Sequence, residues 1–327
     1  MSTDAPTPGS PEPDAADTEI AGSGIADMGA ADVVDLAARH GLDLAADGIT
    51  FNEAGLDYRV AFAHEADDPA RQWVLRLPRR GDVSAKLDAE RAILDFAGPR
   101  LPVAAPDWRI QAPELVAYPL LPGFPGLTLD DDGAPLWHVE SSSPEYAESL
   151  ARVIAALHTL DPDEAEAAGV PRQSPVDVRE TWRADLERVR AEFEVSEDLL
   201  GGWRNWLADD GLWPTETVFT HGELYPAHLL LDEHEDIVAV LDWTTAKVGD
   251  PVVDFAFHCM TASADAFERT VARYTELTGR TEQRLAERCG ALLSAGPLSY
   301  GLYALATGDP GHRAAAAAML NPSPEEP

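Results

Sequence analysis

Cysteine, positive charge and long apolar runs are all scarce in this sequence, and each scarcity excludes a class of protein. The two cysteines, Cys259 and Cys289, show no metal-type pairing and form no framework of bridges, so we expect reduced, buried thiols. No apolar run reaches the roughly 18–20 residues that span a bilayer. Residues 1–28 carry no Lys or Arg and no apolar core, which excludes a signal peptide. We therefore expect a cytoplasmic protein.

The shortage of positive charge is large: 24 Lys and Arg residues face 58 Asp and Glu residues, for a formal net charge of −34. Such a surface repels nucleic-acid phosphates and anionic lipids, so neither a nucleic acid nor a membrane is expected as a partner. It tolerates a cationic small molecule. Solubility is the simpler explanation of the charge, which by itself identifies no ligand.

The 327 residues are 45% hydrophobic, enough for one two-lobed domain or two ordinary ones. Residues 1–28 are dominated by small, polar and acidic residues, and we expect a disordered tail there. Residues 29–118 predict a small α+β lobe, because they contain two segments with a helical apolar period and several short, partly alternating segments that are typical of strands. The expected helices are 32–40 and 85–96, and the expected strands are 49–51, 58–63, 72–77, 108–110 and 114–118.

Residues 119–126 (PLLPGFPG) are rich in chain-breaking residues and predict a hinge. The pattern that follows, 127–315, is mainly helical, and residues 316–327 are expected to fray. Helices are predicted from Ser142 or Ser143 onward and at 179–193, 196–207 and within 262–305, with a β segment at 217–243. The expected fold is therefore α+β, with a small β-rich N-terminal lobe and a larger, mainly helical C-terminal lobe.

The segment Val218–His258 carries the chemistry. A short strand at 218–220 leads into His221, and two further strands, 229–231 and 237–241, are joined by an acidic turn. Glu223, His228 and Asp242 can therefore converge at one end of a hairpin. Two carboxylates and a nitrogen donor suit a Mg²⁺–nucleotide site, because Mg²⁺ takes few protein ligands and completes its shell with phosphate and water. Each of these residues alone has an ordinary structural explanation.

The order of residues in this segment is more specific evidence of function than any one of the residues alone. The pattern H-G-[DE]-x-x-P-x-[HN], a hairpin, [LI]-D-W and then G-D-P-x-x-D-x-A resembles the catalytic core of antibiotic phosphotransferases, which are relatives of protein kinases. His at position 228 and the Asp242–Trp243 pair resemble the macrolide 2′-phosphotransferase branch. Upstream blocks such as NEAGLDYRV and WVLRLPRRGDVSAKLDAE agree, and so does LSYGLYAL near the end. The resemblance covers about residues 30–315.

The resemblance implies a two-lobed protein-kinase-like fold and a role for each matching residue. Glu223 stands where the family has its catalytic carboxylate, usually Asp, and His228 and Asp242 stand at the Mg²⁺ positions. His221 and Asp254 match the part of the family core that braces the catalytic loop. The implied nucleotide-binding residues are Gly55, Arg76, its helix partner Glu90, Tyr118 and Leu120.

The implied reaction transfers the γ-phosphate of GTP, or ATP, to the 2′-hydroxyl of a macrolide amino sugar, with Mg²⁺, in a monomeric protein that confers resistance. Macrolides need a broad apolar wall, for which Trp243, Tyr300 and Tyr303 are candidates, although each has an alternative place in the core. Glu223 is one methylene longer than the usual Asp, and we expect activity to survive because a rotamer change restores hydrogen-bond reach.

Three alternatives remain open. The first is a kinase of the same fold with another small hydroxyl acceptor, such as an aminoglycoside. The second is a non-catalytic nucleotide-binding relative, against which the intact His228, Asp242 and Asp254 argue. The third is a hydrolase that uses Glu223 with His221, for which no nucleophile or metal is evident.

Overall fold

The computed structural model describes residues 28–53, 55, 57–130 and 132–322. The expected tail at 1–28, Met28 excepted, and residues 323–327 of the expected frayed end lie outside these residues. The chain divides into two compact units, which are described separately. The first contains residues up to Leu87 together with Trp108–Leu120. The second contains Asp88–Asp107 and everything from Leu121 onward.

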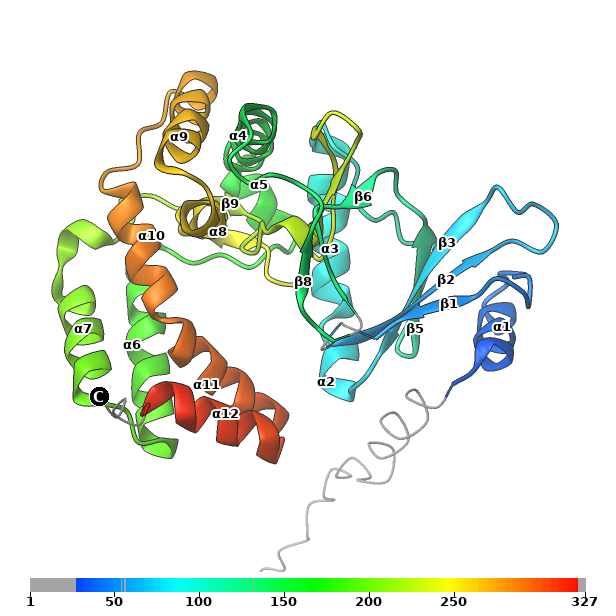
Figure 1. Ribbon diagram of the computed structural model, residues 1–327, viewed down its shortest axis with the longest axis horizontal. Helices are drawn as coiled ribbons and strands as arrows, with labels where there is room; N and C mark the ends of the chain where they lie inside the picture. The colour runs from blue at the N-terminus through cyan, green and yellow to red at the C-terminus, as the bar shows by residue number, and fades with distance from the viewer. Residues whose placement is uncertain (1–27, 54, 56, 131, 323–327) are drawn as a thin grey trace, which may run out of the picture. The chain divides into compact units, whose positions relative to one another are not determined.

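The first unit is an antiparallel sheet with a helix packed on it (Figure 1). The strand order is β1-β2-β3-β5-β4. Val33, Leu36 and Ala37 of the helix share an apolar core with sheet residues such as Ala61 and Leu75. The elements are α1 (Ala30–Arg39), β1 (Thr50–Asn52), β2 (Tyr58–His64), β3 (Gln72–Pro78), the short α2 (Gly81–Ser84), β4 (Ile110–Ala112) and β5 (Leu115–Pro119).

The second unit begins at Asp88, within α3 (Leu87–Ala97), a helix that was expected in the N-terminal lobe. The segment after α3 and the 3-10 turn η1 (Gly98–Arg100) is attached to this unit by its backbone. Ala104 donates its N–H to the carbonyl of Val238 and accepts the N–H of Val240, both at 2.9 Å. The boundary therefore differs from the expected division at 118, because local strand and helix patterns do not show which unit a connecting segment pairs with.

Two small sheets support the second unit. One has the order β11-β10-β6, from Ile237–Val240, Leu229–Leu231 and Phe124–Pro125, and the other pairs β12 (Lys247–Gly249) with β9 (Val218–Thr220). The strand β6 lies inside the expected hinge, so the second half of 119–126 is held in a sheet. A separate hairpin joins β7 (Leu127–Leu129) to β8 (Pro135–Trp137).

The remaining residues of the second unit are mainly helical, as expected. Ser143 caps the first long helix by accepting the N–H of Tyr146. The helices are α4 (Pro144–His158), α5 (Pro162–Ala167), α6 (Pro175–Glu192), α7 (Glu197–Ala208), α8 (Val253–Thr261), α9 (Ala264–Thr278), α10 (Leu285–Ser294), α11 (Gly296–Thr307) and α12 (Pro310–Leu320), with 3-10 turns η2 (Asp210–Leu212) and η3 (Pro226–His228).

Helices α6, α7, α11 and α12 gather around a tryptophan-rich core (Figure 1). The ring of Trp206 lies 4.9 Å from Trp213 and 5.1 Å from Trp182, between centroids. Aromatic pairs of this kind contribute about 0.5–1.5 kcal/mol beyond their burial. Ala316 and Leu320 of α12 are fully buried. The expectation that the chain frays from residue 316 is therefore wrong as far as Leu320.

Two early expectations concern the state of the cysteines and the length of the apolar segments. Both cysteines are free thiols, and Cys289 is buried while Cys259 is half-buried. Among the described residues, no single helix is long and apolar enough to cross a membrane, although the bent pair α10 and α11 passes the same test when its two helices are taken together.

Candidate active site

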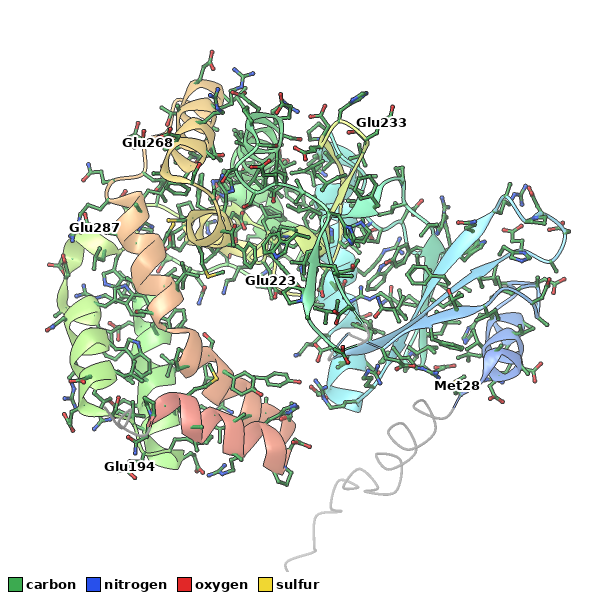
Figure 2. All side chains as sticks on the ribbon, in the orientation of Figure 1. Met28, Glu194, Glu223, Glu233, Glu268 and Glu287 are labelled. Carbon is green, nitrogen blue, oxygen red and sulfur yellow. The ribbon has the colours of Figure 1, made fainter. Side chains whose placement is uncertain are left out.

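The loop between β9 and η3 carries Glu223 and is held by one buried carboxylate (Figure 2). Asp254, in the first turn of α8, is fully buried and accepts the backbone N–H of His221 at 3.1 Å and that of Gly222 at 2.7 Å. These are the hydrogen bonds expected of a residue that braces the loop. A carboxylate oxygen bonded to N–H groups is a strong acceptor, so the loop backbone is fixed from α8.

Two further buried side chains support Asp254, and the sequence analysis missed both. His158, at the end of α4, hydrogen-bonds the Asp254 carboxylate through Nε2 at 3.1 Å and the Tyr274 hydroxyl through Nδ1 at 3.0 Å. Because the Asp254 carboxylate accepts, His158 donates from its Nε2–H. The sequence signal that could have identified His158 is a polar residue on the apolar face of a predicted helix. The chain Tyr274–His158–Asp254 links α9 and α4 to the loop.

His221 fixes the loop from its other side. Its Nε2–H donates to the carbonyl of Leu241 at 3.0 Å, and its Nδ1 accepts the N–H of Glu223 at 3.3 Å. Burial lowers the pKa of His221 to about 4, against the opposing effect of the Asp254 charge. The imidazole is therefore neutral near pH 7, which the hydrogen bond from Glu223 requires because a protonated ring has no acceptor.

Gly222 occupies a position that strongly favours glycine. Its φ is +89°, and a Cβ there would lie 3.0 Å from both the carbonyl oxygen and the Oγ1 of Thr245. The hydroxyl of Thr245 in turn donates to the carbonyl of His221 at 2.9 Å. Any larger residue would therefore combine a strained backbone with a tight contact to Thr245.

His228 and Asp242 meet as the hairpin pattern predicted. Nε2 of His228 lies 3.7 Å from Oδ2 of Asp242, and the backbone N–H of Leu241 donates to the carbonyl of His228 at 2.8 Å. Nδ1–H of His228 donates to the carbonyl of Glu223 at 3.2 Å, so Nε2 is the ring nitrogen on the Asp242 side. The backbone of Asp242 has a φ of +57°, and Thr244 Oγ1 donates to Oδ1 at 2.6 Å.

This pair fits a Mg²⁺ ion bound together with a nucleotide. The 3.7 Å separation is wider than the roughly 2.9 Å between two adjacent octahedral ligands held at about 2.0–2.1 Å from one ion, so the two side chains would move closer when the ion binds. The positive φ of Asp242 is a strained backbone conformation, and residues with such strain cluster at ligand-binding sites. Among the described residues, no cluster of three or more metal-ligating side chains occurs. The other ligands would therefore be phosphate oxygens and water, as Mg²⁺ prefers.

Trp243, expected to contact the acceptor, is placed differently. Its side chain is fully buried, its Nε1–H donates to the carbonyl of Val240 at 3.0 Å, and its ring lies 4.9 Å from that of His221. A side chain with no exposed surface cannot line a binding surface. The assignment of Trp243 to substrate binding is therefore corrected: it packs beneath the loop and holds the His221 ring.

The expected nucleotide-binding residues are distributed over both units. In the first unit, Arg76 of β3 is buried, and its guanidinium lies 3.8 Å from the centroid of the Tyr58 ring. Gly55 accepts a hydrogen bond from Arg79 Nε at 3.0 Å. Tyr118 is buried in β5, and Leu120 is exposed with its N–H donated to the carbonyl of Gln72 at 2.8 Å. In the second unit, Glu90 is buried on α3.

The remaining expected residues lie on α11. Tyr300 packs partly against the tryptophan-rich core, and its ring centroid is 5.9 Å from that of Tyr303. Tyr303 lies 5.0 Å from the ring of His312 on α12. Both tyrosines are half-buried, so each combines a packing role with some accessible surface.

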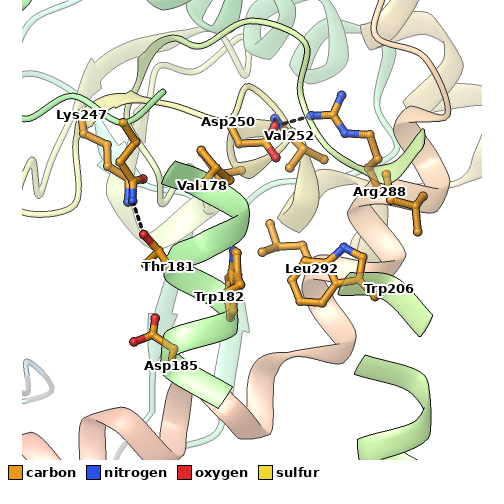
Figure 3. A pocket seen from close by; sticks show the side chains of 13 residues that line it. Val178, Thr181, Trp182, Asp185, Trp206, Lys247, Asp250, Val252, Arg288 and Leu292 are labelled. Carbon is orange, nitrogen blue, oxygen red and sulfur yellow. Dashed lines mark hydrogen bonds and ion pairs between the residues drawn. The ribbon is translucent and has the colours of Figure 1, made fainter. Parts of the chain in front are cut away.

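A pocket of ≈150 Å³ lies between α6, α10 and the segment around Asp250 (Figure 3). Buried Arg288 pairs there with Asp250 and, at 2.8 Å, with Glu282. Burial raises the pKa of Asp250 to about 6, against the effect of Arg288. Glu223, His228 and Asp242 are not among the described residues that line it, which are Gln173, Val178, Thr181, Trp182, Asp185, Trp206, Leu212, Lys247, Asp250, Val252, Val253, Arg288 and Leu292.

Comparison with known proteins finds chains that are similar to this one over most of its length. The crystal structure of macrolide 2′-phosphotransferase MphH from Brachybacterium faecium is 53% identical, with a TM-score of 0.82, over 90% of this chain and 98% of that one. A macrolide 2′-phosphotransferase type I is 39% identical, with a TM-score of 0.83, over 90% and 99%. The uncharacterized protein YcbJ of Bacillus subtilis (strain 168) is 34% identical over 279 residues, 84% of this chain and 90% of that protein.

These similarities confirm the expected α+β, kinase-like fold and the expected enzyme class. The model of the phosphotransferase enzyme family APH matches residues 48–288, which contain the loop, its bracing residues and the His228–Asp242 pair. The chain is a phosphotransferase similar to macrolide 2′-phosphotransferases, and it belongs to the APH phosphotransferase enzyme family.

Proposed function

We propose that this protein transfers the γ-phosphate of GTP to the 2′-hydroxyl of the amino sugar of macrolide antibiotics and thereby confers resistance. The observation that carries the proposal is the 53% identity, over nearly the full length of both chains, with a macrolide 2′-phosphotransferase. The braced Glu223 loop and the adjacent His228–Asp242 pair supply the chemistry that such a reaction needs.

In this proposal Glu223 orients the acceptor hydroxyl and takes its proton. Its backbone is fixed at both ends, since its N–H donates to His221 and its carbonyl accepts from His228. Phosphoryl transfer depends mainly on positioning and on neutralising negative charge, so a rigid loop contributes directly to the rate. The side chain itself is exposed, as a residue that meets a diffusing acceptor must be.

His228 and Asp242 would hold Mg²⁺, which, when bound with the nucleotide, neutralises the phosphate charge. In the first unit, Arg76 would steady the phosphates, while Gly55, Tyr118 and Leu120 would lie along the nucleotide. Glu90 is the proposed nucleotide-binding residue of α3 in the second unit. The N–H of Leu120 is already donated to Gln72, so this residue would offer its carbonyl or its side chain and not its N–H. Tyr300 and Tyr303 remain proposed apolar contacts of the acceptor.

The proposal is tested by incubating the protein with Mg²⁺, γ-labelled GTP or ATP and a panel of acceptors that contains macrolides of different ring size and an aminoglycoside. We expect label in the macrolides, with GTP preferred. The Glu223→Gln variant is expected to lose about 100- to 10,000-fold in kcat, the usual contribution of a positioned base. Label in the aminoglycoside alone contradicts the macrolide assignment, and full turnover by Glu223→Gln contradicts the catalytic one.

A further inference from the structure

A row of aromatic rings leads away from the His228–Asp242 pair within the second unit. Tyr225 follows Glu223 by two residues, and its ring centroid is 4.4 Å from that of His228. Phe257 of α8 lies 5.3 Å from Tyr225, and Trp137 of β8 stacks on Phe257 at 6.3 Å with an interplanar angle of 30°. The row thus begins inside the loop that carries Glu223 and ends on the β7–β8 hairpin.

The burial of the rings changes along the row. Tyr225 and Phe257 are half-buried, and Trp137 is 44% exposed. Leu129, which is 48% exposed, lies on the same face of the hairpin as Trp137, because Leu127 is the cross-strand partner of Trp137 and successive side chains alternate. Met260, one helical turn beyond Phe257 on α8, is also exposed. The exposed end is therefore broad and apolar.

The chain segment that leads into the hairpin is fixed against the catalytic loop. A Cβ on Gly126 would lie 3.0 Å from Cβ of Pro226 and 2.9 Å from Cδ1 of Leu231, so the two segments approach closely at this glycine. The N–H of Gly126 also donates to the carbonyl of Leu229 at 3.0 Å, and its carbonyl accepts the N–H of His138 at 2.9 Å. The apolar face is therefore held in a defined position relative to Glu223.

We infer that Tyr225, Phe257 and Trp137 form an acceptor wall, on which the apolar ring system of the phosphate acceptor lies while its hydroxyl reaches Glu223. This inference rests on the proposed function and adds the residues that select for a bulky apolar acceptor. Rigid aromatic side chains supply large contact areas at low entropic cost, which suits such a surface.

Charge near the wall specifies the acceptor further. The carboxylate of Glu223 is exposed at the buried end of the row, and its negative charge favours a cation beside the target hydroxyl. The wall therefore suits an acceptor with a large apolar ring and a cationic group next to the hydroxyl that is phosphorylated.

The test compares two acceptors, erythromycin and the methyl glycoside of its amino sugar, which has the hydroxyl and the amine but no lactone ring. For Trp137→Ala we expect the KM for erythromycin to rise roughly tenfold, as the loss of one aromatic contact predicts. The KM for the methyl glycoside, the KM for GTP and kcat stay within twofold. Trp137→Phe recovers most of the loss. Met319→Ala, which removes an equally exposed apolar side chain from α12, changes none of these values.

Three results overturn the acceptor wall. The first is an unchanged KM for erythromycin in Trp137→Ala. The second is an equal rise in KM for both acceptors, which would show that the substitution distorts the loop. The third is a wild-type dimer in sedimentation that Trp137→Ala abolishes, which would show that the exposed rings bind a second copy of the chain. If the wild type phosphorylates neither acceptor, the proposed function fails and the wall fails with it. If the wild type phosphorylates erythromycin and Trp137→Ala leaves its KM unchanged, the acceptor wall is refuted while the proposed function stands.

Discussion

The carboxylate of Asp254 accepts the backbone N–H of Gly222 at 2.7 Å, and through this hydrogen bond a helix fixes the loop that carries Glu223. Asp254 is fully buried and receives two more hydrogen bonds, from the backbone N–H of His221 and from His158. The position of the proposed base thus depends on a residue that does not itself contact the acceptor.

Replacing Asp254 by Asn is expected to lower kcat roughly 10- to 100-fold, because an amide nitrogen cannot accept the N–H groups that one carboxylate oxygen now binds, at a cost of about 1–3 kcal/mol. Steady-state kinetics with macrolide and GTP measure the effect, and thermal unfolding shows how much of it is instability. Asp265→Asn, an exposed change in the first turn of α9, serves as control. Equal kcat in both variants would refute the role of Asp254.

Gly222→Ala is expected to abolish activity, because the new Cβ would meet Thr245 at 3.0 Å in a backbone conformation with φ of +89°. Gly308→Ala is the matched control, since Gly308 also has a positive φ of +65° but no atom within 4 Å of its Cβ position. The control should lose only about 1 kcal/mol of stability and keep its kcat. Comparable activity in the two variants would contradict the close packing described for the loop.

Glu223→Asp shortens the proposed base by one methylene, or roughly 1.5 Å. Because the carboxylate needs only to lie within hydrogen-bond reach of the hydroxyl, we expect kcat to remain within about tenfold of the wild type. The assay is macrolide-dependent consumption of GTP. A loss as deep as that of Glu223→Gln would show that this active site requires the longer side chain.

Asp242→Asn is expected to raise the Mg²⁺ concentration needed for half-maximal activity at least tenfold, because a neutral amide replaces the only charged ligand of the proposed pair. His228→Ala should act in the same direction. Activity is titrated against free Mg²⁺ after treatment with a chelator. His234→Ala, a change in the exposed turn between β10 and β11, is the control. An unchanged Mg²⁺ requirement in both site variants would place the metal elsewhere.

Stability should depend on pH through two buried histidines. Burial lowers the pKa of His221 and that of His258 to about 4, from an ordinary value of 6.5. A lowered pKa stabilises the fold above 6.5, and this stability is lost as the pH falls through about 4. The pKa of Asp250 is raised to about 6, so this residue acts in the opposite direction. Its contribution to the stability of the fold is lost as the pH rises through 6.

Urea unfolding at pH 7.5 and pH 5 measures the balance, and we expect the lower free energy of unfolding at pH 5. The variant His258→Phe removes one titrating ring, which packs against Tyr146 and hydrogen-bonds Thr270. Its free energy of unfolding should change less between the two pH values than that of the wild type. A steeper change than in the wild type would contradict the burial effect at His258.

The sequence by itself determined most elements and the order of the chemical groups. Helix α1 and strands β2 and β3 follow from alternating or helical patterns, and the expected bounds agree with the observed ones to within about two residues. The pairing of His228 with Asp242 followed from a hairpin between two short apolar strands. These features are local, because they depend on side-chain periodicity and on turns that neighbouring residues specify.

Other features were decided only by tertiary structure. The sequence of α12 does not show that Ala316 and Leu320 are buried against distant helices, and this burial fixes the end of the helix to the core. Trp243 directly follows Asp242, the proposed metal ligand, in sequence, yet its side chain is buried in the core against the His221 ring. The support of Asp254 by His158 and the row of rings from Tyr225 to Trp137 each join segments far apart in the chain. Contacts of that kind depend on how elements pack, which no local pattern encodes.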